Sequence, residues 1–276
     1  MRYITMRQLG NYGRLGNQMF QYATLIGIAK TYDLVVLVPD GKYQLLETFT
    51  LDSPYKSLNL KTDMISWRGP YIERHFHYDS FIANSPSVYS LSRGTGIDVQ
   101  GYFQTEKYFV HARTDVLGAF TFKDESIDLS TKEYFSKVDY PSVTIGVRRG
   151  DYTGLPDFHP IPSMDYYKSA IQKIYEMHGK CSYHIVSDDI EWCKYNFPSI
   201  YSEEYGSFHY PHGGYANDLA LFKHSDHNIV GNSSFHWWGS WLNEKETKTV
   251  IAPSRWFGPR GPQDWHDIYC KDWIRL

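Results

Sequence analysis

Short apolar runs alternate along this chain with stretches in which apolar side chains recur at helical spacing. Near the N-terminus, residues 3–6 predict a strand, residues 17–32 predict a helix, and the continuous apolar run 34–38 predicts a second strand. A strand-helix-strand unit predicts two parallel strands joined by a right-handed crossover.

The same alternation is clearer in the second half of the chain. Strands are predicted at 143–147, 183–186, 228–231 and 249–252, the last taken as the final strand. Helices are predicted at 163–177 with Ser163 as cap, at 191–195, at 217–224 with Asn217 or Asp218 as cap, and from the 232–234 turn to 242. Residues 42–135 are broken by Pro, Gly and Ser, and we assign them to mixed helix and loop. The alternation favours an α/β fold with parallel, doubly wound sheets.

Polar clusters follow three of these predicted strands. They are Arg148 with Arg149, Ser187 with Asp188, and Asn232 with Ser233 and Ser234. Open parallel sheets bind ligands at the edge formed by the carboxyl ends of the strands. The sequence therefore predicts one binding site that all three clusters share.

Composition narrows the class of protein. The 276 residues, 42% of them hydrophobic, suffice for one large or two medium domains, and a net charge of −3 gives no whole-chain support for nucleic-acid binding. Three cysteines without a CxxC motif favour a reducing compartment, so we expect a cytoplasmic protein. No apolar run approaches the roughly 20 residues of a membrane span. We expect a soluble chain, with peripheral membrane association left open.

The adjacent arginines at the end of a buried strand indicate an anionic ligand. A guanidinium keeps its charge and binds phosphate oxygens bidentately. A salt-bridged surface turn is the alternative reading. Asp151 is the carboxylate nearest the pair in sequence, which makes it a candidate general base, although it could instead hold Arg149 or the loop.

The other two clusters each carry more than one reading. The turn at 232–235 could bind phosphate through free N–H groups, the helix dipole and hydroxyls, or it could simply cap a helix. The segment 187–189 could hold a metal, accept N–H donors from a guanine edge, or cap the next helix. Because the arginines can supply the charge that Mg²⁺ would supply, we expect no essential metal.

Two further motifs are ambiguous. The loop at 13–18 lacks dinucleotide-binding spacing, so it is either a structural turn or a cleft-facing loop that presents Arg14, Asn17 and Gln18. The histidine pairs at 75/77 and 209/212 have no carboxylate or cysteine at ligand spacing, so we read both as non-metal.

Taken together, five motifs resemble those of the α-1,2-fucosyltransferases, glycosyltransferase family 11. In order they are GRLGNQMFQYA at 13–23, GYFQTEKYF at 101–109, VRRGDY at 147–152, SDDIEWC at 187–193 and NSSFHWWG at 232–239. They span nearly the whole chain, and five ordered motifs are far more specific than any one alone. One position departs from the family pattern, because the arginine motif usually begins with His and here has Gly146.

The resemblance implies a GT-B fold, in which two Rossmann-like domains have parallel sheets that face each other across a cleft. We assign residues 1–138 to an acceptor-side domain and 139–276 to a GDP-fucose-binding domain. The implied activity is inverting transfer of L-fucose from GDP-β-L-fucose to the 2-hydroxyl of a terminal galactose in a glycan. The implied partners are this donor substrate and a galactose-terminated acceptor, with no other cofactor, no metal and no nucleic acid.

The resemblance also implies roles for single residues. The expected donor-binding residues are Arg14, Gly16, Arg148, Arg149, Ser187, Asp188, Asn232, Ser233, Ser234 and Phe235. Among these, Asp188 would read guanine. The expected catalytic residues are Arg149, Asp151 and Asn17. Two alternatives remain: a GT-B transferase for another nucleotide sugar or acceptor, and a noncatalytic glycan- or nucleotide-binding homologue.

Overall fold

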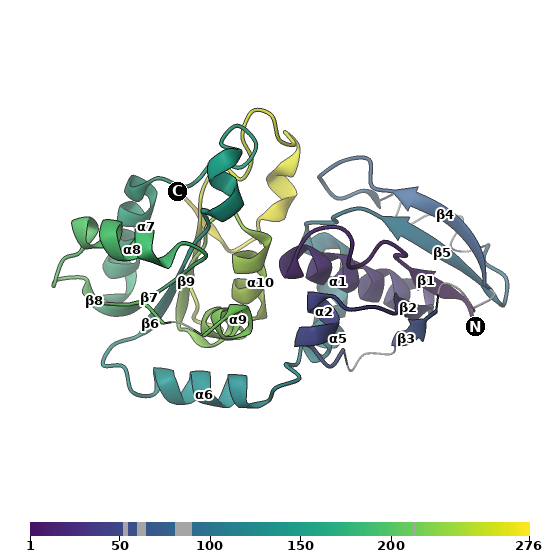
Figure 1. Cartoon of the computed structure of the whole chain (residues 1–276), viewed down its shortest axis with the longest axis horizontal. Helices are drawn as coiled ribbons and strands as arrows, with labels where there is room; N and C mark the ends of the chain where they lie inside the picture. The colour runs from purple at the N-terminus through teal and green to yellow at the C-terminus, as the bar shows by residue number, and fades with distance from the viewer. Residues whose placement is uncertain (52–54, 60–64, 81–89, 212) are drawn as a thin grey trace. The chain divides into compact units, whose positions relative to one another are not determined.

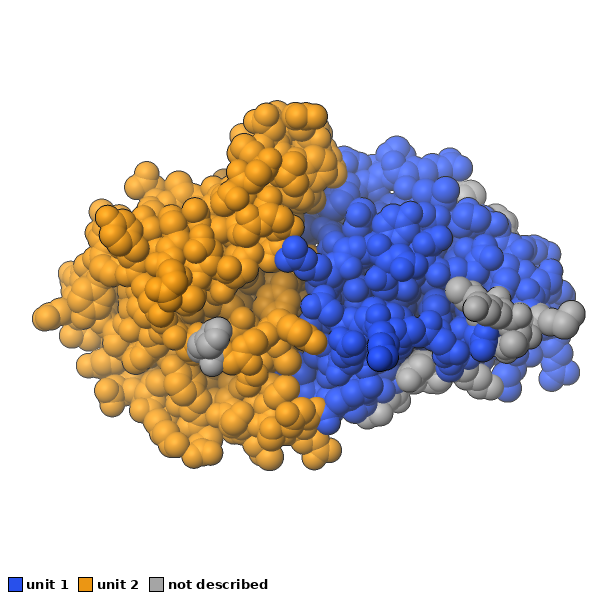
Figure 2. Space-filling view, in the orientation of Figure 1, with its two compact units in different colours: residues 1–123, 264–270 blue, residues 124–263, 271–276 orange. Residues whose placement is uncertain are grey.

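The chain forms two compact units, seen in a computed structural model that describes residues 1–51, 55–59, 65–80, 90–211 and 213–276. Unit 1 comprises Met1–Lys123 and Asp264–Cys270, and unit 2 comprises Asp124–Gln263 and Lys271–Leu276 (Figures 1 and 2). Within the described residues, no helix combines the length and the apolar character that crossing a membrane requires.

The division between the units differs from the expected boundary after residue 138. Helix α6 (Ser126–Phe135) lies in unit 2, where Asp128 pairs with Lys223 at 2.9 Å and the Tyr134 hydroxyl lies 2.9 Å from Nδ1 of His184. The segment 264–270 belongs to unit 1 although the residues on either side of it belong to unit 2. Sequence order alone does not reveal such a return.

Unit 1 contains a parallel sheet with the order β3-β2-β1-β5-β4 among the described residues. Its strands are β1 (Tyr3–Thr5), β2 (Val35–Pro39), β3 (Tyr55–Leu58), β4 (Ser66–Ile72) and β5 (Thr95–Gln100). Its helices are α1 (Leu15–Tyr32), α2 (Gln44–Thr48) and α5 (Arg113–Ala119), with 3-10 turns η1 (Glu106–Tyr108), η2 (Val110–Ala112) and η5 (Trp265–Ile268). The β1–α1–β2 unit confirms the predicted parallel pair of strands joined through a helix.

The assignment of residues 42–135 to helix and loop is wrong where β3, β4 and β5 occur. Strand β4 is largely exposed and contains Gly69 and Pro70, so it shows neither alternation nor an apolar run. Strand β5 carries the buried Asp98, whose Oδ2 lies 2.8 Å from Nε of Arg7. The ion pair compensates for burying a carboxylate that sequence patterning reads as surface.

Unit 2 contains a second parallel sheet, with the order β11-β10-β9-β6-β7-β8 among the described residues. Its strands are β6 (Ser142–Val147), β7 (Cys181–Ser187), β8 (Gly206–His209), β9 (His227–Ile229), β10 (Val250–Ala252) and β11 (Ile274–Arg275). The prediction that 249–252 is the final strand is wrong, because β11 follows it. The remaining helices are α7 (Met164–His178), α8 (Ile190–Asn196), α9 (Tyr215–His224) and α10 (Ser234–Leu242), with 3-10 turns η3 (Gly150–Gly154) and η4 (Phe197–Ile200).

The strand order of unit 2 creates a topological switch point. From β6 the chain adds β7 and β8 on one side, then returns to place β9, β10 and β11 on the other. Strands β6 and β9 are neighbours, with Thr144 opposite Asn228. The loops that leave their carboxyl ends diverge, and open α/β sheets bind ligands in the crevice that results.

Helix caps follow one prediction and overturn another. Ser163 caps α7 as predicted, and its hydroxyl accepts the N–H of Tyr166 at 3.3 Å. Helix α9 begins at Tyr215 with Gly214 as its cap, so the prediction that Asn217 or Asp218 caps it is wrong. The earlier start leaves Asp218 inside the first helical turn.

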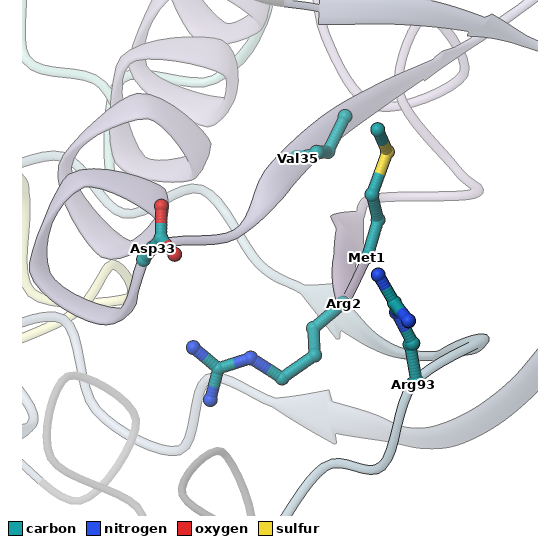
Figure 3. A pocket seen from close by; sticks show the side chains of 5 residues that line it. All are labelled: Met1, Arg2, Asp33, Val35 and Arg93. Carbon is teal, nitrogen blue, oxygen red and sulfur yellow. The ribbon is translucent and has the colours of Figure 1, made fainter.

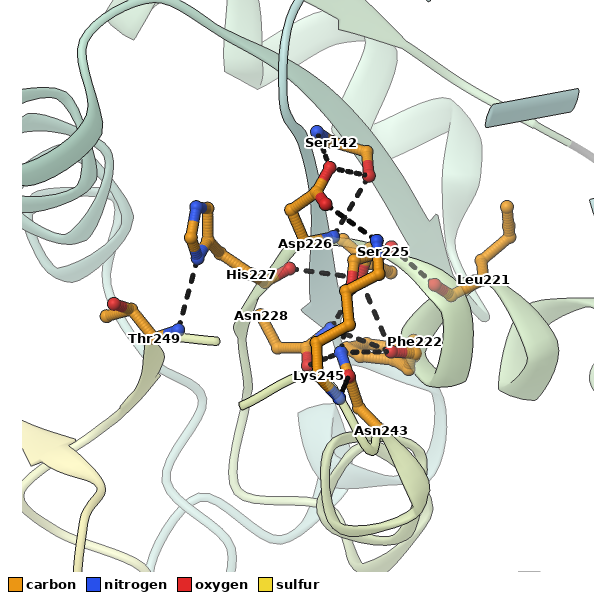
Figure 4. Close-up of polar contacts among 11 residues, drawn as sticks. Ser142, Leu221, Phe222, Ser225, Asp226, His227, Asn228, Asn243, Lys245 and Thr249 are labelled. Carbon is orange, nitrogen blue, oxygen red and sulfur yellow. Dashed lines mark hydrogen bonds and ion pairs between the residues drawn. The ribbon is translucent and has the colours of Figure 1, made fainter. Parts of the chain in front are cut away.

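A buried polar network fastens α9 to the amino end of the sheet in unit 2 (Figure 4). The side-chain amide of Asn228 donates to the carbonyl of Phe222 at 3.1 Å and to Oγ of Ser225 at 2.8 Å. The amide of Asn243 donates to the carbonyl of Ser225 at 2.8 Å. Buried amides that are satisfied in this way make the position of α9 specific, because moving the helix would leave them without partners.

Candidate functional site

Arg148 follows β6 directly and is held by carboxylates from two loops. Its Nη1 lies 2.8 Å from Oδ2 of Asp188, and its Nη2 donates to Oδ1 of Asp151. Its side chain is only 17% exposed. Because a guanidinium cannot lose its charge, these carboxylates are what allow it to lie so deep at the strand end.

Arg149 is oriented by three contacts. Its backbone N–H donates to Oδ1 of Asp188 at 2.9 Å, and its Nε donates to Oδ2 of Asp189 at 3.0 Å. The guanidinium carbon lies 3.9 Å from the ring centre of Trp192, a close cation–π contact. Among the described residues, its two terminal nitrogens have no hydrogen bond. They remain available to a bidentate anion.

Gly150 permits this arrangement because it has no side chain. A Cβ at this position would lie 2.3 Å from Oδ2 of Asp188. Both oxygens of Asp188 are occupied by Arg148 and Arg149. A guanine edge at Asp188, as the sequence analysis expected, would have to share these oxygens with the two arginines.

Of the alternatives for the segment 187–189, helix capping is the one seen for Asp189, and Ser187 supports it. The Oγ of Ser187 accepts the N–H of Asp189 at 2.9 Å, and Oδ1 of Asp189 accepts the N–H of Trp192 at 3.3 Å as the cap of α8. Both residues thereby position the carboxylate that holds Arg149.

The turn after β9 lies on the same edge of the sheet. Ser233 caps α10, and its hydroxyl accepts the N–H of Phe235 at 3.3 Å. The buried amide of Asn232 donates to the carbonyls of Pro160 and Trp256, and the hydroxyl of Tyr152 donates to the carbonyl of Asn232 at 3.3 Å. Tyr152 thus links the arginine loop to the α10 turn. Ser234 begins the helix, whose N-terminus favours an anion.

The structure explains Gly146. A Cβ on Gly146 would come within 2.5 Å of Cγ and Nδ1 of His236, which projects from α10. Burial lowers the pKa of His236 to about 3, and the charge of Arg148 acts in the same direction. A neutral imidazole from α10 therefore occupies the space beside Gly146. Sequence reasoning placed His236 within the 232–239 motif but gave it no role of its own.

Asp218 is a second residue whose unusual environment sequence reasoning missed. Helix α9 leads into β9, so its first turn lies toward the carboxyl ends of the strands, and Oγ1 of Thr144 donates to the carbonyl of Leu221 at 3.1 Å to hold the helix on β6. Burial raises the pKa of the Asp218 carboxyl to about 7. The described residues provide no hydrogen bond or ion pair to this carboxylate. Groups perturbed in this way concentrate at functional sites.

In unit 1, the glycine loop after β1 packs against its own helix. Gly13 has φ +77°, and a Cβ there would lie 2.1 Å from Nδ2 of Asn17. The Oδ1 of Asn17 accepts from Nε2 of Gln104 at 2.8 Å, which joins two of the sequence motifs. Arg14 is exposed at the start of α1 and Asn17 is half-buried, so both can offer side chains to a ligand, whereas Gly16 can offer only its backbone. Gln18 is buried, where its amide donates to the carbonyl of Gly13 and accepts the N–H of Leu45.

Glu73 holds the 101–104 motif from the end of β4, a role that sequence reasoning missed. Its Oε2 accepts the N–H of Tyr102 at 2.7 Å and its Oε1 accepts the N–H of Phe103 at 3.0 Å. Phe103 has φ +53°, an unfavourable conformation for a bulky side chain. The carboxylate fixes the turn that brings Gln104 to Asn17.

A hollow of about 330 Å³ in unit 1 lies at the edge of its sheet that the amino ends of the strands form (Figure 3). Met1, Arg2, Asp33, Val35 and Arg93 line it. The Nη2 of Arg2 donates to the carbonyl of Tyr32 at 2.6 Å, in the last turn of α1. This arginine stabilises a helix C-terminus.

Comparison with known proteins agrees with these features. The family model described as glycosyl transferase family 11 matches residues 3–276. The O-antigen biosynthesis glycosyltransferase WbnK of Escherichia coli is 26% identical over 303 residues, which cover 96% of this chain and 98% of that protein. An alpha-1,2-colitosyltransferase of Escherichia coli is 29% identical over 184 residues, which cover 65% of this chain and 62% of that protein.

The fold also matches solved structures. A mutant of Arabidopsis thaliana FUT1 in complex with GDP superimposes with a TM-score of 0.58 and 16% identity, and the match covers 91% of this chain and 70% of that one. Together with the two parallel sheets, this likeness confirms the expected GT-B fold.

We expect positions 146 and 236 to be energetically coupled. Gly146→Ala should destabilise the protein by about 1–3 kcal/mol, because the added methyl overlaps the His236 ring. In the His236→Ala background the same change should cost about 1 kcal/mol less, which urea unfolding of the four proteins measures. Gly118→Ala in α5 meets no atom within 4 Å and serves as the control. Strictly additive losses would contradict the steric explanation.

We expect Asp218→Asn to stabilise the unliganded protein increasingly as pH rises. The folded protein keeps this carboxyl protonated up to a pKa of about 7, whereas the unfolded chain ionises near the ordinary value of 3.8, so wild-type stability falls through that window. The Tm difference between variant and wild type should therefore grow from pH 5 to pH 8.

Asp226→Asn is the matched control for this experiment. Although burial acts in the opposite direction, Lys245 and Ser142 hold the pKa of Asp226 below its ordinary value. Ionised Asp226 therefore stabilises the folded protein above the ordinary pKa, and its loss should lower Tm at pH 8. A Tm difference for Asp218→Asn that does not change with pH would show that this carboxyl is not perturbed.

Proposed function

Because this chain belongs to glycosyltransferase family 11, we propose that it is an inverting α-1,2-fucosyltransferase. It would transfer L-fucose from GDP-β-L-fucose to the 2-hydroxyl of a terminal galactose in a glycan. The observation that carries this proposal is that the two terminal nitrogens of Arg149 have no hydrogen bond to any residue that the structure describes. They lie at the switch point of a Rossmann-like sheet, on the same edge as the N-terminus of α10.

The donor diphosphate would bind at this edge of unit 2. The guanidinium of Arg149 offers a planar fork that matches two phosphate oxygens, and the first N–H groups of α10 favour an anion. Trp192 and Asp189 fix the guanidinium before the ligand arrives, so little reorganisation is needed. Fixed cations of this kind stabilise the negative charge that develops on the departing GDP, and the proposed reaction needs no metal for that purpose.

The reaction would be a single in-line displacement. The acceptor hydroxyl attacks the anomeric carbon of fucose, the bond to the β-phosphate breaks, and the configuration inverts through an oxocarbenium-like transition state. Asp151 is the proposed base. Its carboxylate is 50% exposed and pairs with Arg148 in the unliganded protein. A phosphate that engages Arg148 would release Asp151 to accept the hydroxyl proton.

Asp218 is the better candidate than Asp188 for contacting the nucleobase. Guanine presents an N1–H and an N2–H side by side, and an ionised carboxylate can accept both. Asp188 already accepts from Arg148 and Arg149, whereas Asp218 has no partner among the described residues. Binding guanine would give the buried carboxylate the hydrogen bonds that favour its ionised form.

A second candidate is transfer of a different sugar from a nucleotide donor. One similar Escherichia coli protein is named a colitosyltransferase, and the arginine clamp and guanine contact would serve any GDP-sugar equally. The two candidates differ in the sugar of the donor, whereas Arg149 and Asp218 would contact its diphosphate and its nucleobase.

The central prediction is transfer by the purified full chain. With GDP-fucose and a galactoside panel that includes lactose and N-acetyllactosamine, in EDTA, we expect an α-1,2-linked product identified by NMR. Arg149→Ala should lower kcat/KM by about 100- to 1000-fold, because a charge-stabilising donor is lost. Lys173→Ala on the exposed face of α7 should have no effect.

The other outcomes separate the candidates. Transfer only from another GDP-sugar would select the second candidate. GDP-fucose binding by calorimetry without any transfer would indicate a binding protein. Absence of binding to every GDP-sugar would refute the donor site.

Asp151→Asn tests the assignment of the base. If Asp151 accepts the proton, kcat should fall by roughly 100- to 10,000-fold while GDP-fucose affinity stays within a few fold. Asp157→Asn removes an exposed carboxylate from the same loop and is the matched control. A near-normal kcat in the first variant would exclude Asp151 as the base.

A further inference from the structure

Two histidines follow the end of β4 in unit 1, at positions 75 and 77. The sequence provides no carboxylate or cysteine at ligand spacing from them, but the fold brings Asp264 to the pair from a segment 187 residues further along the chain. One ligand atom from each of His75, His77 and Asp264 can be chosen so that all three lie within 4.8 Å of one another.

We propose that His75, His77 and Asp264 form a binding site for a divalent transition metal of the Zn²⁺ class. Two imidazoles and one carboxylate are ligands that Zn²⁺ accepts, whereas Mg²⁺ and Ca²⁺ prefer oxygen ligands alone. Ligand atoms about 2.0–2.2 Å from a tetrahedral Zn²⁺ lie roughly 3.3–3.6 Å apart. The present separations of up to 4.8 Å exceed that spacing, and both histidines are exposed, so their side chains have room to move toward it.

The arrangement of His75 and His77 favours a metal bound by both imidazoles over a hydrogen bond between His77 and Asp264 alone. The Nδ1 of His77 lies 3.0 Å from Oδ2 of Asp264, but within the described residues His75 makes no hydrogen bond. The two imidazole rings stack with centres 5.0 Å apart and an angle of 15° between their planes. A metal would give His75 the partner that it lacks.

The carboxylate is held in place by the backbone between the histidines. The N–H of Phe76 donates to Oδ2 of Asp264 at 3.0 Å, so the carboxylate is oriented before any metal arrives. Lys107 pairs with Asp267 rather than with Asp264. A hydrogen bond to a metal-binding carboxylate, such as that from Phe76 to Asp264, orients the carboxylate and increases its affinity for the metal.

The consequence would be an additional attachment of the segment 264–270 to unit 1. The N–H of Tyr78 donates to Asp267 at 2.9 Å, and Lys107 pairs with the same carboxylate at 2.5 Å. This segment lies in unit 1 while the chain before and after it belongs to unit 2. A metal would therefore stabilise unit 1 where the C-terminal part of the chain returns to it, outside the residues assigned to the transfer reaction.

The test is titration of EDTA-treated, dialysed and tag-free full-length protein with ZnCl₂ by calorimetry. We expect one equivalent to bind, and the His75→Gln/His77→Gln double variant to bind at least about 100-fold more weakly. His266→Gln removes an exposed histidine from the same segment without touching the cluster, and should bind Zn²⁺ like the wild type. MgCl₂ should give no binding.

Thermal unfolding supplies a second measurement that does not depend on enzymatic activity. Saturating Zn²⁺ should raise Tm by several degrees in the wild type and in His266→Gln, but not in the double variant. Equal Tm values without metal would show that the double variant is folded. Zn²⁺ binding that is absent in the wild type, or equally strong in the double variant, would overturn the proposal. Neither measurement needs a donor or an acceptor, so the result is independent of the proposed transferase reaction.

Discussion

The strand order of unit 2 is the constraint on which the candidate site depends. Because β6 and β9 are neighbours while their connections leave in opposite directions, the arginine loop and the start of α10 emerge on one edge without a helix between them. A hydrogen bond from the Tyr152 hydroxyl to the carbonyl of Asn232 then joins the two loops. An anion at this edge would meet both a guanidinium and a helix N-terminus, although neither is adjacent to the other in sequence.

Two guanidiniums at that edge need carboxylate partners, and the two arginines differ in how they bind them. The terminal nitrogens of Arg148 pair with Asp151 and Asp188. Arg149 is instead fixed through its backbone, its Nε and the ring of Trp192. A buried ion pair gains little net stability, because desolvation offsets the attraction. The arrangement therefore makes most sense as orientation of Arg149 toward a ligand, with Arg148 exchanging carboxylates for phosphate.

Sequence periodicity predicted β6, β7, β9 and β10 of unit 2, because these buried parallel strands are largely apolar, and it predicted α7, which has a clear apolar stripe, but it missed β8 and β11. It failed where the stabilising partner is distant. Strand β5 carries Asp98, which is acceptable only beside Arg7, and β4 is exposed and interrupted by Pro70. The candidate site divides in the same way: the polar clusters at strand ends were predictable, but the buried position of the Asp218 carboxyl depends on where α9 begins.

The exchange at Gly146 shows why a motif departure need not remove a function. The position lost a side chain, yet the space is filled by the ring of His236, which is buried and neutral beside Arg148. A side chain at position 146 would overlap the present position of the His236 ring, so the packing at the two positions is coupled. If the usual histidine of the motif shapes the donor pocket, an imidazole supplied from α10 can shape it here. Gly146 is therefore weak evidence for a noncatalytic protein.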